Sequence, residues 1–398
     1  MHPRPRGKKE SYLDSVKPQR DVFAGHTTTP SEINARAATL GFDAPLPTWV
    51  ERFADKMRLH TPDYGKPFLM HQWGEMVHPL SAKDLSPGGV KLPAIRVPSD
   101  ELRVFILGDS GTNNADQSQV ADTFLKQRAD DAKAPHFAIH VGDGFYNNGV
   151  TDAKDPKFKE VFDDYYGAFD RPIYYALGNH DYGDSLGSGN PDAFVEYSVN
   201  NEVTNLTFPE RYFSYSYEFG KKSARFFTLD TNTLLSDPKQ LEWLKEELSE
   251  SSADFNIIVG HHPILSDGSH GDQAHFQDAL LPLVDKYADI YVCGHEHDQQ
   301  LMLSQNGAPF LRSGAAGEER DVGSSNRSLF SAGKLGFASL NFSDEGINVS
   351  FVDDRTGGTV FETLLQSRSE RQRETLPKPK YSPKNKSPSL LLDPSESY

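Results

Sequence analysis

Five short blocks of the sequence combine residue types that bind metal ions, and each block directly follows an apolar run. They read Gly108-Asp109-Ser110-Gly111, Gly142-Asp143-Gly144-Phe145-Tyr146, Gly178-Asn179-His180-Asp181, Gly260-His261-His262-Pro263 and Gly294-His295-Glu296-His297. Their candidate ligands are two carboxylates, one amide oxygen, three imidazoles and a phenol. This donor set exceeds a single tetrahedral site and suits two metal ions that share a carboxylate.

A single block of this kind is weak support for a site, because Gly-Asp at the end of a strand usually forms a turn. Gly-His-x-His is scarcer, since residues at i and i+2 of a strand point to the same side and two such histidines serve little purpose in packing. Glycine beside these residues lets the backbone turn sharply and approach a bound group. Five such blocks in order therefore favour a site over five separate turns.

The segments between the blocks predict the elements that position these residues. From residue 101 onward, short apolar runs alternate with segments of helical pattern at 117–129, 158–168, 238–249 and 273–286. Fully apolar strands that alternate with helices indicate a sheet covered on both faces. Residues 212–230 have the pattern of a hairpin, and residues 332–364 that of antiparallel strands. We therefore predict an α/β two-sheet sandwich, in which ligands bind beyond the carboxyl ends of the strands.

Two flanking regions differ from this central domain, which we assign to residues 99–365. Residues 1–98 are predicted to form a partly disordered N-terminal extension, with short helices near 30–41 and 48–59 and a wrap or linker over 60–98. Residues 366–398 are rich in Pro, Ser, Lys and Arg, and this composition predicts a disordered basic tail.

The composition of the chain excludes several classes of protein. With 41 Lys and Arg against 57 Asp and Glu, the formal net charge is −16, which disfavours nucleic acid as a structural partner and anionic membrane surfaces. The single cysteine, Cys293, rules out an intramolecular disulfide and Cys-based zinc or iron–sulfur sites. No apolar run reaches the roughly 18 residues that span a bilayer, and the N-terminus lacks the apolar stretch of a secretory signal. We expect a cytoplasmic protein by default, with export by a route that reads other signals left open, and a monomer.

The five blocks resemble those of the calcineurin-like metallophosphoesterases, and more closely those of the small purple acid phosphatases of the tartrate-resistant type. The resemblance extends over residues 102–317 and includes Leu229-Asp230-Thr231 and Leu241-Glu242-Trp243-Leu244. The first block lacks the histidine that most relatives carry, and Tyr146 stands three residues after Asp143, as in the purple enzymes. The resemblance implies a four-layer α/β/β/α sandwich.

The resemblance also implies a role for each site residue. When the family's ligands are transferred position by position, the first metal would be bound by Asp109, Tyr146 and His297. The second would be bound by Asn179, His261 and His295, and Asp143 would bridge the two. A phenolate at Tyr146 favours Fe³⁺ in the first site, and the second is expected to take Fe²⁺, Zn²⁺ or Mn²⁺. His180 would act as a general acid or bind a phosphate oxygen, Asp181 would orient it, and His270 would be a further active-site histidine.

Other residues near the blocks receive structural interpretations. His262 points to the opposite side of the strand from His261 and is expected to form core or pocket wall. Glu296 and Asp298 flank ligand histidines and are expected to support them from behind. His140 is expected to be incidental, and Cys293 a small apolar filler.

The implied activity is that of an acid phosphatase, which hydrolyses phosphate monoesters by attack of a metal-bound hydroxide and has an acidic optimum. Small phosphorylated molecules or phosphopeptides are the expected substrates. Two alternatives stay open: a phosphodiesterase acting on nucleotides or lipid headgroups, and a metal-binding interaction module whose catalysis has decayed. Gly144 stands where the family usually has Asn and Ser110 where Trp is common, so substrate preference also stays open.

Overall fold

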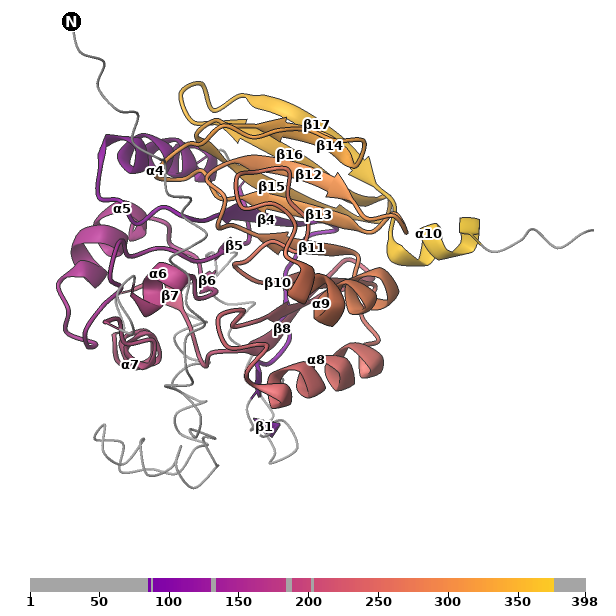
Figure 1. The fold of residues 1–398 in the computed structure, drawn as a ribbon, viewed down its shortest axis with the longest axis horizontal. Coiled ribbons are helices and arrows are strands. Elements are labelled where there is room, and N and C mark those ends of the chain that lie inside the picture. The colour runs from indigo at the N-terminus through magenta and orange to yellow at the C-terminus, as the bar shows by residue number, and fades with distance from the viewer. Residues whose placement is uncertain (1–84, 87–88, 130–133, 184–187, 202–203, 376–398) are drawn as a thin grey trace, which may run out of the picture.

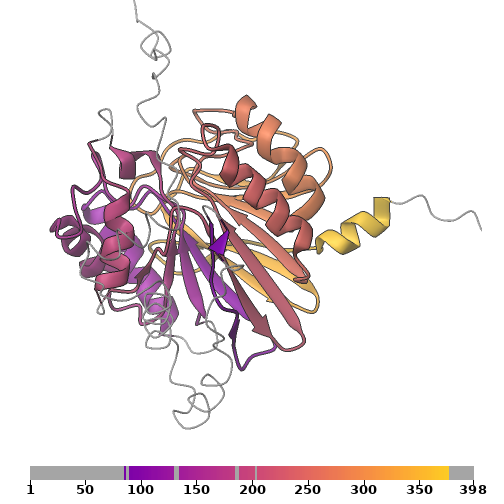
Figure 2. The same ribbon diagram turned by 90° about the horizontal axis from the view of Figure 1, so that it is seen from below.

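The structure is a computed structural model that describes residues 85–86, 89–129, 134–183, 188–201 and 204–375. Within these residues, two sheets pack against each other and helices cover their outer faces, which confirms the predicted α/β/β/α sandwich (Figure 1). Figure 2 shows the strands between the purple helices of one outer layer and the orange helices of the other. The helices predicted near 30–41 and 48–59 lie outside the described residues.

The first sheet, sheet A, has the strand order β1-β2-β8-β9-β10-β11-β13-β12-β14, and β3 also pairs with β8. Its strands are β1 (Leu85–Ser86), β2 (Gly89–Lys91), β3 (Ile95–Arg96), β8 (Phe213–Phe219), β9 (Lys222–Thr228), β10 (Phe255–Val259), β11 (Ile290–Cys293), β12 (Gln299–Leu303), β13 (Pro309–Ser313) and β14 (Ser328–Ala332). Strands β9, β10, β11 and β13 run parallel to one another. The predicted hairpin is present, because β8 and β9 pair antiparallel.

The second sheet, sheet B, has the strand order β17-β16-β15-β4-β5-β6-β7. Its strands are β4 (Leu102–Leu107), β5 (Phe137–His140), β6 (Ile173–Tyr175), β7 (Leu206–Thr207), β15 (Gly336–Ser343), β16 (Gly346–Asp353) and β17 (Thr359–Leu365). Strands β4 to β7 are parallel. Strands β15 to β17 are antiparallel, as the alternating pattern near the end of the domain predicted.

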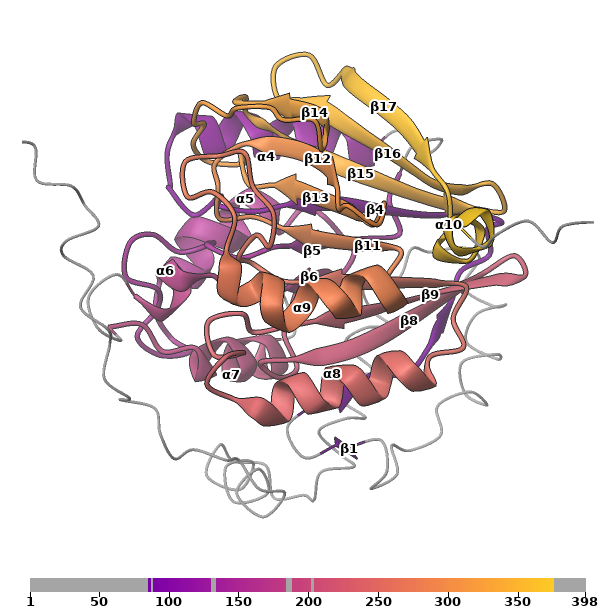
Figure 3. The same ribbon diagram turned by 45° about the vertical axis from the view of Figure 1, so that its right-hand side comes forward.

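The four predicted helical segments are present with nearly the predicted bounds, and three helices, at 179–182, 192–200 and 368–375, were not predicted. They are α4 (Ala115–Arg128), the π-helix η2 (Phe158–Asp163), α5 (Asp164–Tyr166), α6 (Asn179–Tyr182), α7 (Asp192–Asn200), α8 (Pro238–Glu250), α9 (Ala274–Tyr287) and α10 (Arg368–Thr375). Helix α4 begins where the Asn114 side chain accepts a hydrogen bond from the backbone of Gln117 at 2.9 Å, which satisfies one free N–H of the first turn. Figure 3 shows α8 and α9 side by side against sheet A. Among the described residues, no helix has the length and apolarity of a membrane span.

Aromatic side chains fill the space between the sheets. Phe137 of β5 stacks on Tyr217 of β8 with a centroid separation of 4.3 Å, and Phe226 of β9 meets Phe342 of β15 at 5.9 Å. Each fully buried aromatic of this kind contributes about 1.5–3 kcal/mol of hydrophobic stabilisation. The two sheets therefore form a rigid base for the loops at their edges.

The ordered domain extends beyond the predicted boundaries at both ends. Strands β2 and β3 pair with β8 ahead of residue 99, where the domain was predicted to start. Helix α10 lies beyond residue 365, within the predicted tail. There the Arg371 guanidinium donates to the carbonyl of Ala288 at 3.1 Å, and the backbone N–H of Arg368 donates to the Asp289 carboxylate. These tertiary contacts, rather than any apolar face, fix the helix, so the prediction of a disordered tail is wrong for this segment.

Candidate metal centre

The five blocks meet at one edge of the sandwich, because the strands that precede them within each sheet are parallel. Strands β4, β5 and β6 lead to Asp109, Asp143 and Asn179, and strands β10 and β11 lead to His261 and His295. The loops of the two sheets are in contact, since the backbone N–H of His295 lies 3.0 Å from both carboxylate oxygens of Asp109. Residues almost 190 positions apart are thus brought together by the strand order.

Three of these residues adopt a left-handed backbone conformation, which side chains other than glycine rarely adopt. The φ angles are 56° at Asp109, 53° at Asp143 and 74° at His295. Such a conformation costs on the order of 1–3 kcal/mol per residue and persists only where surrounding contacts enforce it, typically at functional sites. At Gly178 an added Cβ would overlap the Asp143 carboxylate, so glycine is needed for this loop to approach.

A first group of ligand atoms surrounds Tyr146. Its Oη lies 3.0 Å from His297 Nε2, 3.3 Å from Asp143 Oδ2 and 3.4 Å from Asp109 Oδ1. His297 Nε2 is 3.8 Å from Asp109 Oδ1. Ligand atoms that bind one ion at about 2.0–2.2 Å are themselves separated by about 3.0–3.6 Å, so the three distances from Tyr146 Oη fit a common cation and the fourth is slightly longer.

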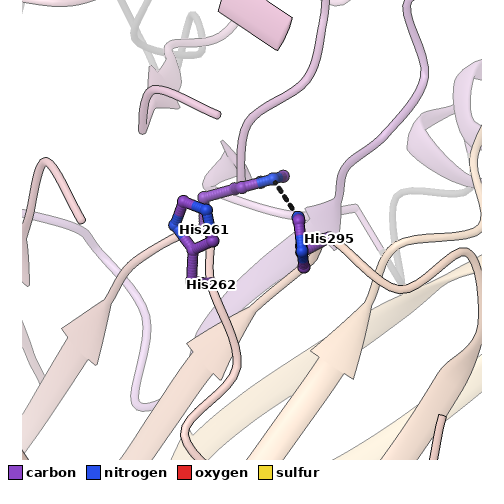
Figure 4. Close-up of side chains that lie close together, drawn as sticks. All are labelled: His261, His262 and His295. Atoms are coloured by element: carbon purple, nitrogen blue, oxygen red, sulfur yellow. Dashed lines mark hydrogen bonds between the residues drawn. The ribbon is translucent and has the colours of Figure 1, made fainter. Parts of the chain in front are cut away.

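A second group consists of Asn179, His261 and His295. His261 Nε2 lies 3.1 Å from Asn179 Oδ1 and 3.2 Å from His295 Nδ1, and the last two atoms are 2.9 Å apart. Figure 4 shows the histidines of this group with His262, and the dashed line joins His261 to His295. His262 belongs to the wall of the site, because its Nδ1 is engaged with Thr231 Oγ1 at 2.8 Å and its ring lies 4.7 Å from that of His295.

Asp143 connects the two groups through one oxygen. Its Oδ2 lies 3.3 Å from Tyr146 Oη and 3.3 Å from His261 Nε2. Its other oxygen, Oδ1, accepts a hydrogen bond from the backbone of His180 at 2.8 Å. The structure thus brings together every residue that the sequence proposed as a ligand, with the proposed bridging carboxylate between the two groups.

The electrostatics of the cluster also suit cations. Burial raises the pKa of the Asp109 carboxyl, and the Asp143 charge raises it further against the opposing charge of His261. Burial likewise raises the pKa of the Tyr146 hydroxyl, with Asp109 and Asp143 adding to the effect. For Asp143 itself, burial raises the pKa, but His261 and His180 together lower it more, to about 2. Positive charge between these acidic groups relieves their repulsion, and the donor set therefore fits two metal ions.

The ligand imidazoles differ in charge, because burial lowers the pKa of His261 but the Asp143 carboxylate raises it more, to about 9. Burial lowers the pKa of His297 to about 4 and that of His295 well below its ordinary value. His261 Nδ1 lies 2.8 Å from the carbonyl of Val141, which can only accept, so Nδ1 donates there and Nε2 is the nitrogen that would lose its proton to bind a cation. His297 Nδ1 lies 2.6 Å from Glu318 Oε2, which leaves Nε2 facing the first group.

His180 lies beside the first group. We had proposed from the sequence that Asp181 orients it, but the two side chains have different partners. Its ring is 4.5 Å from that of Tyr146, and its Nδ1 donates to the carbonyl of Asn147 at 3.0 Å. Asp181 is buried and accepts hydrogen bonds from the backbone of Gly178 at 2.8 Å and of Asp143 at 3.1 Å. Residues next to each other in a helix do not face each other, which explains the different partners. Asp181 therefore joins the two loops that carry Asn179 and Asp143.

His270 lies beside the second group, with its ring 4.6 Å from that of His295. Its Nδ1 is 3.1 Å from the Oε2 of Glu296, whose side chain is buried. Burial raises the pKa of Glu296, but hydrogen bonds from His270 lower it more, to about 2. His270 is thus fixed at the opposite end of the cluster from His180.

Two residues of the site escaped the sequence analysis. Tyr175 has the pattern of a core residue, yet its hydroxyl donates to the Asp181 carboxylate at 2.9 Å and accepts from the backbone of Gly144 at 2.8 Å. His140, expected to be incidental, stacks on Tyr175 at 4.7 Å and contacts Ser110 Oγ at 2.8 Å through Nε2. The sequence could have indicated this role, because His140 directly precedes the Val141-Gly142-Asp143 turn that carries a candidate ligand.

Comparisons with known proteins agree with this arrangement. The sequence profile of the calcineurin-like phosphoesterase family matches residues 102–299, which include all five blocks. The chain is 31% identical over 303 residues to purple acid phosphatase 3 of Arabidopsis thaliana, an alignment that covers 68% of this chain and 78% of that protein. The chain belongs to the purple acid phosphatase family. It is accordingly a phosphoesterase with a dinuclear metal centre, and the predicted resemblance is confirmed.

Two further similarities concern an animal enzyme and a solved structure. The tartrate-resistant acid phosphatase type 5 of Sus scrofa is 28% identical over 342 residues, covering 74% of this purple acid phosphatase and 96% of the pig protein. GAP50, described as the anchor in the inner membrane complex of Plasmodium, superimposes with a TM-score of 0.62 at 24% identity, covering 69% of this chain and 94% of that one. At that identity the likeness to GAP50 concerns the fold alone.

Proposed function

We propose that this purple acid phosphatase hydrolyses phosphate monoesters of small molecules or peptides. The observation that carries the proposal is the position of Asp143 Oδ2, at 3.3 Å from a ligand atom of each group. Asp109, Tyr146 and His297 would bind one ion, Asn179, His261 and His295 the other, and Asp143 both. When bound, such a cation pair activates a water molecule near neutral pH and stabilises charge on the phosphoryl oxygens.

The residues of the first group favour a trivalent ion. Tyr146 is surrounded by two buried carboxylates, which oppose ionisation of its hydroxyl. A phenolate at this position therefore needs a strongly charged, hard cation, and Fe³⁺ meets that requirement. The second group offers an amide oxygen and two imidazoles beside Asp143, a set that suits Fe²⁺, Zn²⁺ or Mn²⁺.

The two histidines that are not ligands have complementary positions. Because His180 Nδ1 donates to Asn147, its Nε2 is the free nitrogen on the side of Tyr146, and it would donate to a phosphoryl oxygen when the ring is an imidazolium. Because His270 Nδ1 faces Glu296, its Nε2 is left to donate a proton on the side of His295. We assign His180 to binding a phosphoryl oxygen and His270 to protonating the leaving group.

The proposal is tested on the full chain by metal analysis, visible spectroscopy and two substrates. We expect two metal ions per chain, at least one of them iron, and a phenolate-to-iron colour that disappears in Tyr146→Phe. Tyr165→Phe is the matched control, because Tyr165 contacts Asn113 rather than a ligand, and it should keep the colour.

The substrates are p-nitrophenyl phosphate and bis(p-nitrophenyl) phosphate. A value of kcat/KM at least tenfold higher for the monoester supports the proposal. Faster hydrolysis of the diester would identify a phosphodiesterase instead, and hydrolysis of neither by the metal-loaded protein would contradict both.

A further inference from the structure

We propose that Glu296 is a positioning residue for His270, and that it fixes the imidazole so that Nε2 donates a proton to the leaving group. The inference rests on the proposed function. As the bond from phosphorus to the leaving oxygen breaks, that oxygen keeps the electron pair and takes the proton of His270 Nε2. Water supplies the oxygen of the new bond to phosphorus, and the proton that water releases restores His270.

The contacts of Glu296 support this assignment because they all lie on the segment that carries His270. Oε1 accepts from Ser266 Oγ at 3.0 Å and from the backbone of His270 at 2.8 Å. Oε2 accepts from the backbone and the hydroxyl of Ser269, each at 3.0 Å, and lies 3.1 Å from His270 Nδ1. A buried carboxylate needs such a set of donors, and here one loop supplies it.

The side chains of Glu296 and His270 differ in how far they are exposed to solvent. The Glu296 side chain is 1% exposed, whereas that of His270 is 41% exposed. The carboxylate therefore contacts one side of the ring from within the protein, while part of the ring is exposed to solvent near His295. The residues on either side of Glu296, His295 and His297, contribute atoms to the two ligand groups.

The loop that carries His270 has a second attachment on its outer side. Arg327 lies 3.3 Å from the Asp267 carboxylate and 2.8 Å from that of Asp272. At Gly268 an added Cβ would lie 2.6 Å from the carboxyl carbon of Glu296, so glycine allows the loop to approach. The position of the His270 imidazole is thus set by the contacts of its loop with Glu296 on the inner side and with Arg327 on the outer side.

A purely structural role for Glu296 makes a different prediction from a positioning role. Glu296→Gln keeps the size of the side chain but places an amide N–H₂ where the backbone N–H groups of Ser269 and His270 and the His270 ring now donate to the carboxylate. If Glu296 acts through His270, the variant should lower kcat about 10–100-fold for phenyl phosphate, whose leaving group needs a proton. It should change kcat less than about threefold for p-nitrophenyl phosphate, whose leaving group needs little help.

A double-mutant cycle isolates the coupling. In a His270→Ala background, Glu296→Gln should change the phenyl phosphate rate by less than about threefold, because the group it positions is gone. Ser266→Ala is the matched control, since it removes one hydrogen bond to the same carboxylate without touching the imidazole. It should not alter the ratio of the two substrate rates. Metal content is measured for every variant.

A second readout requires no turnover. In nitrogen-15 spectra of the full chain loaded with Zn²⁺, the Nδ1–H signal of His270 should be visible in the wild type and lost in Glu296→Gln. Equal slowing of both substrates, additivity in the His270→Ala background or an unchanged Nδ1–H signal would overturn the inference. Failure of the wild type to hydrolyse either monoester would refute the proposed function instead, and the spectrum distinguishes the two failures because it is recorded without substrate.

Discussion

The contact between Gly144 and Tyr175 gives a sharp test of how the bridging loop is supported. Gly144 follows Asp143, and its backbone N–H donates to Tyr175 Oη at 2.8 Å and to Asp181 Oδ1 at 3.2 Å. A Cβ added at Gly144 would overlap the Tyr175 hydroxyl and lie 3.1 Å from two of its ring carbons. Gly144→Ala therefore forces the tyrosine, or the loop that carries Asp143, to move.

The size of the effect follows from three contributions to the free energy of unfolding. Overpacking in a dense region costs about 1–3 kcal/mol. Weakening a buried hydrogen bond costs about 1–2 kcal/mol. The smaller conformational freedom of alanine in the unfolded chain offsets about 0.4–1 kcal/mol. We expect Gly144→Ala to lower the free energy of unfolding by about 1–4.6 kcal/mol.

Urea unfolding of the variants measures this cost. In a Tyr175→Phe background, where the hydroxyl is absent, Gly144→Ala should cost at least about 1 kcal/mol less than in the wild type. Gly358→Ala is the matched control, because Gly358 is exposed and an added Cβ there would meet only the Thr356 side chain, and it should change stability by less than about 0.5 kcal/mol. A cost below 0.5 kcal/mol at Gly144, or strict additivity with Tyr175→Phe, would refute the reasoning.

Three further predictions follow from the site. Asp143→Asn should lower metal content at both positions, whereas His180→Ala should keep both metals and lose turnover; full turnover in His180→Ala would remove its assigned role. A chelator should lower the free energy of unfolding of the wild type by about 2.7 kcal/mol, compared with the protein in the presence of metal at 100 times its Kd. It should have no such effect on Asp143→Asn. Asp298→Asn should cost about 3–5 kcal/mol in urea unfolding, because it leaves the buried Arg312, now 2.6 Å from Asp298, without its countercharge; a cost under 1 kcal/mol would contradict this.

The central fold was predictable because its strands are continuous apolar runs. Residues such as Phe137 and Ile173 belong to strands buried on both faces, and this pattern differs plainly from that of the intervening helices. The two ends of the domain were harder to predict from the sequence. Strands β2 and β3 are only three and two residues long and depend on pairing with β8. Helix α10 has no apolar residue, so only its contacts with Ala288 and Asp289 reveal it.

The candidate ligands were predictable from the strand ends and the family resemblance, but their supports were not. Asp181 was paired with its sequence neighbour His180, whereas its partners come from the loops that begin at Gly142 and Gly178. Tyr175 lies in an apolar run and looks like core, although its hydroxyl supports the loop after Asp143. Such contacts join residues that are distant in the sequence, so they can be identified only once the packing of the separate elements is known.

The most direct test of the dinuclear site is anomalous diffraction from crystals of the full chain grown with iron and zinc. Data collected on both sides of the iron absorption edge would locate the iron. We predict two peaks that share Asp143 Oδ2, with the iron peak beside Tyr146 Oη and the other beside Asn179. A single peak, or two peaks that do not share Asp143, would contradict the account.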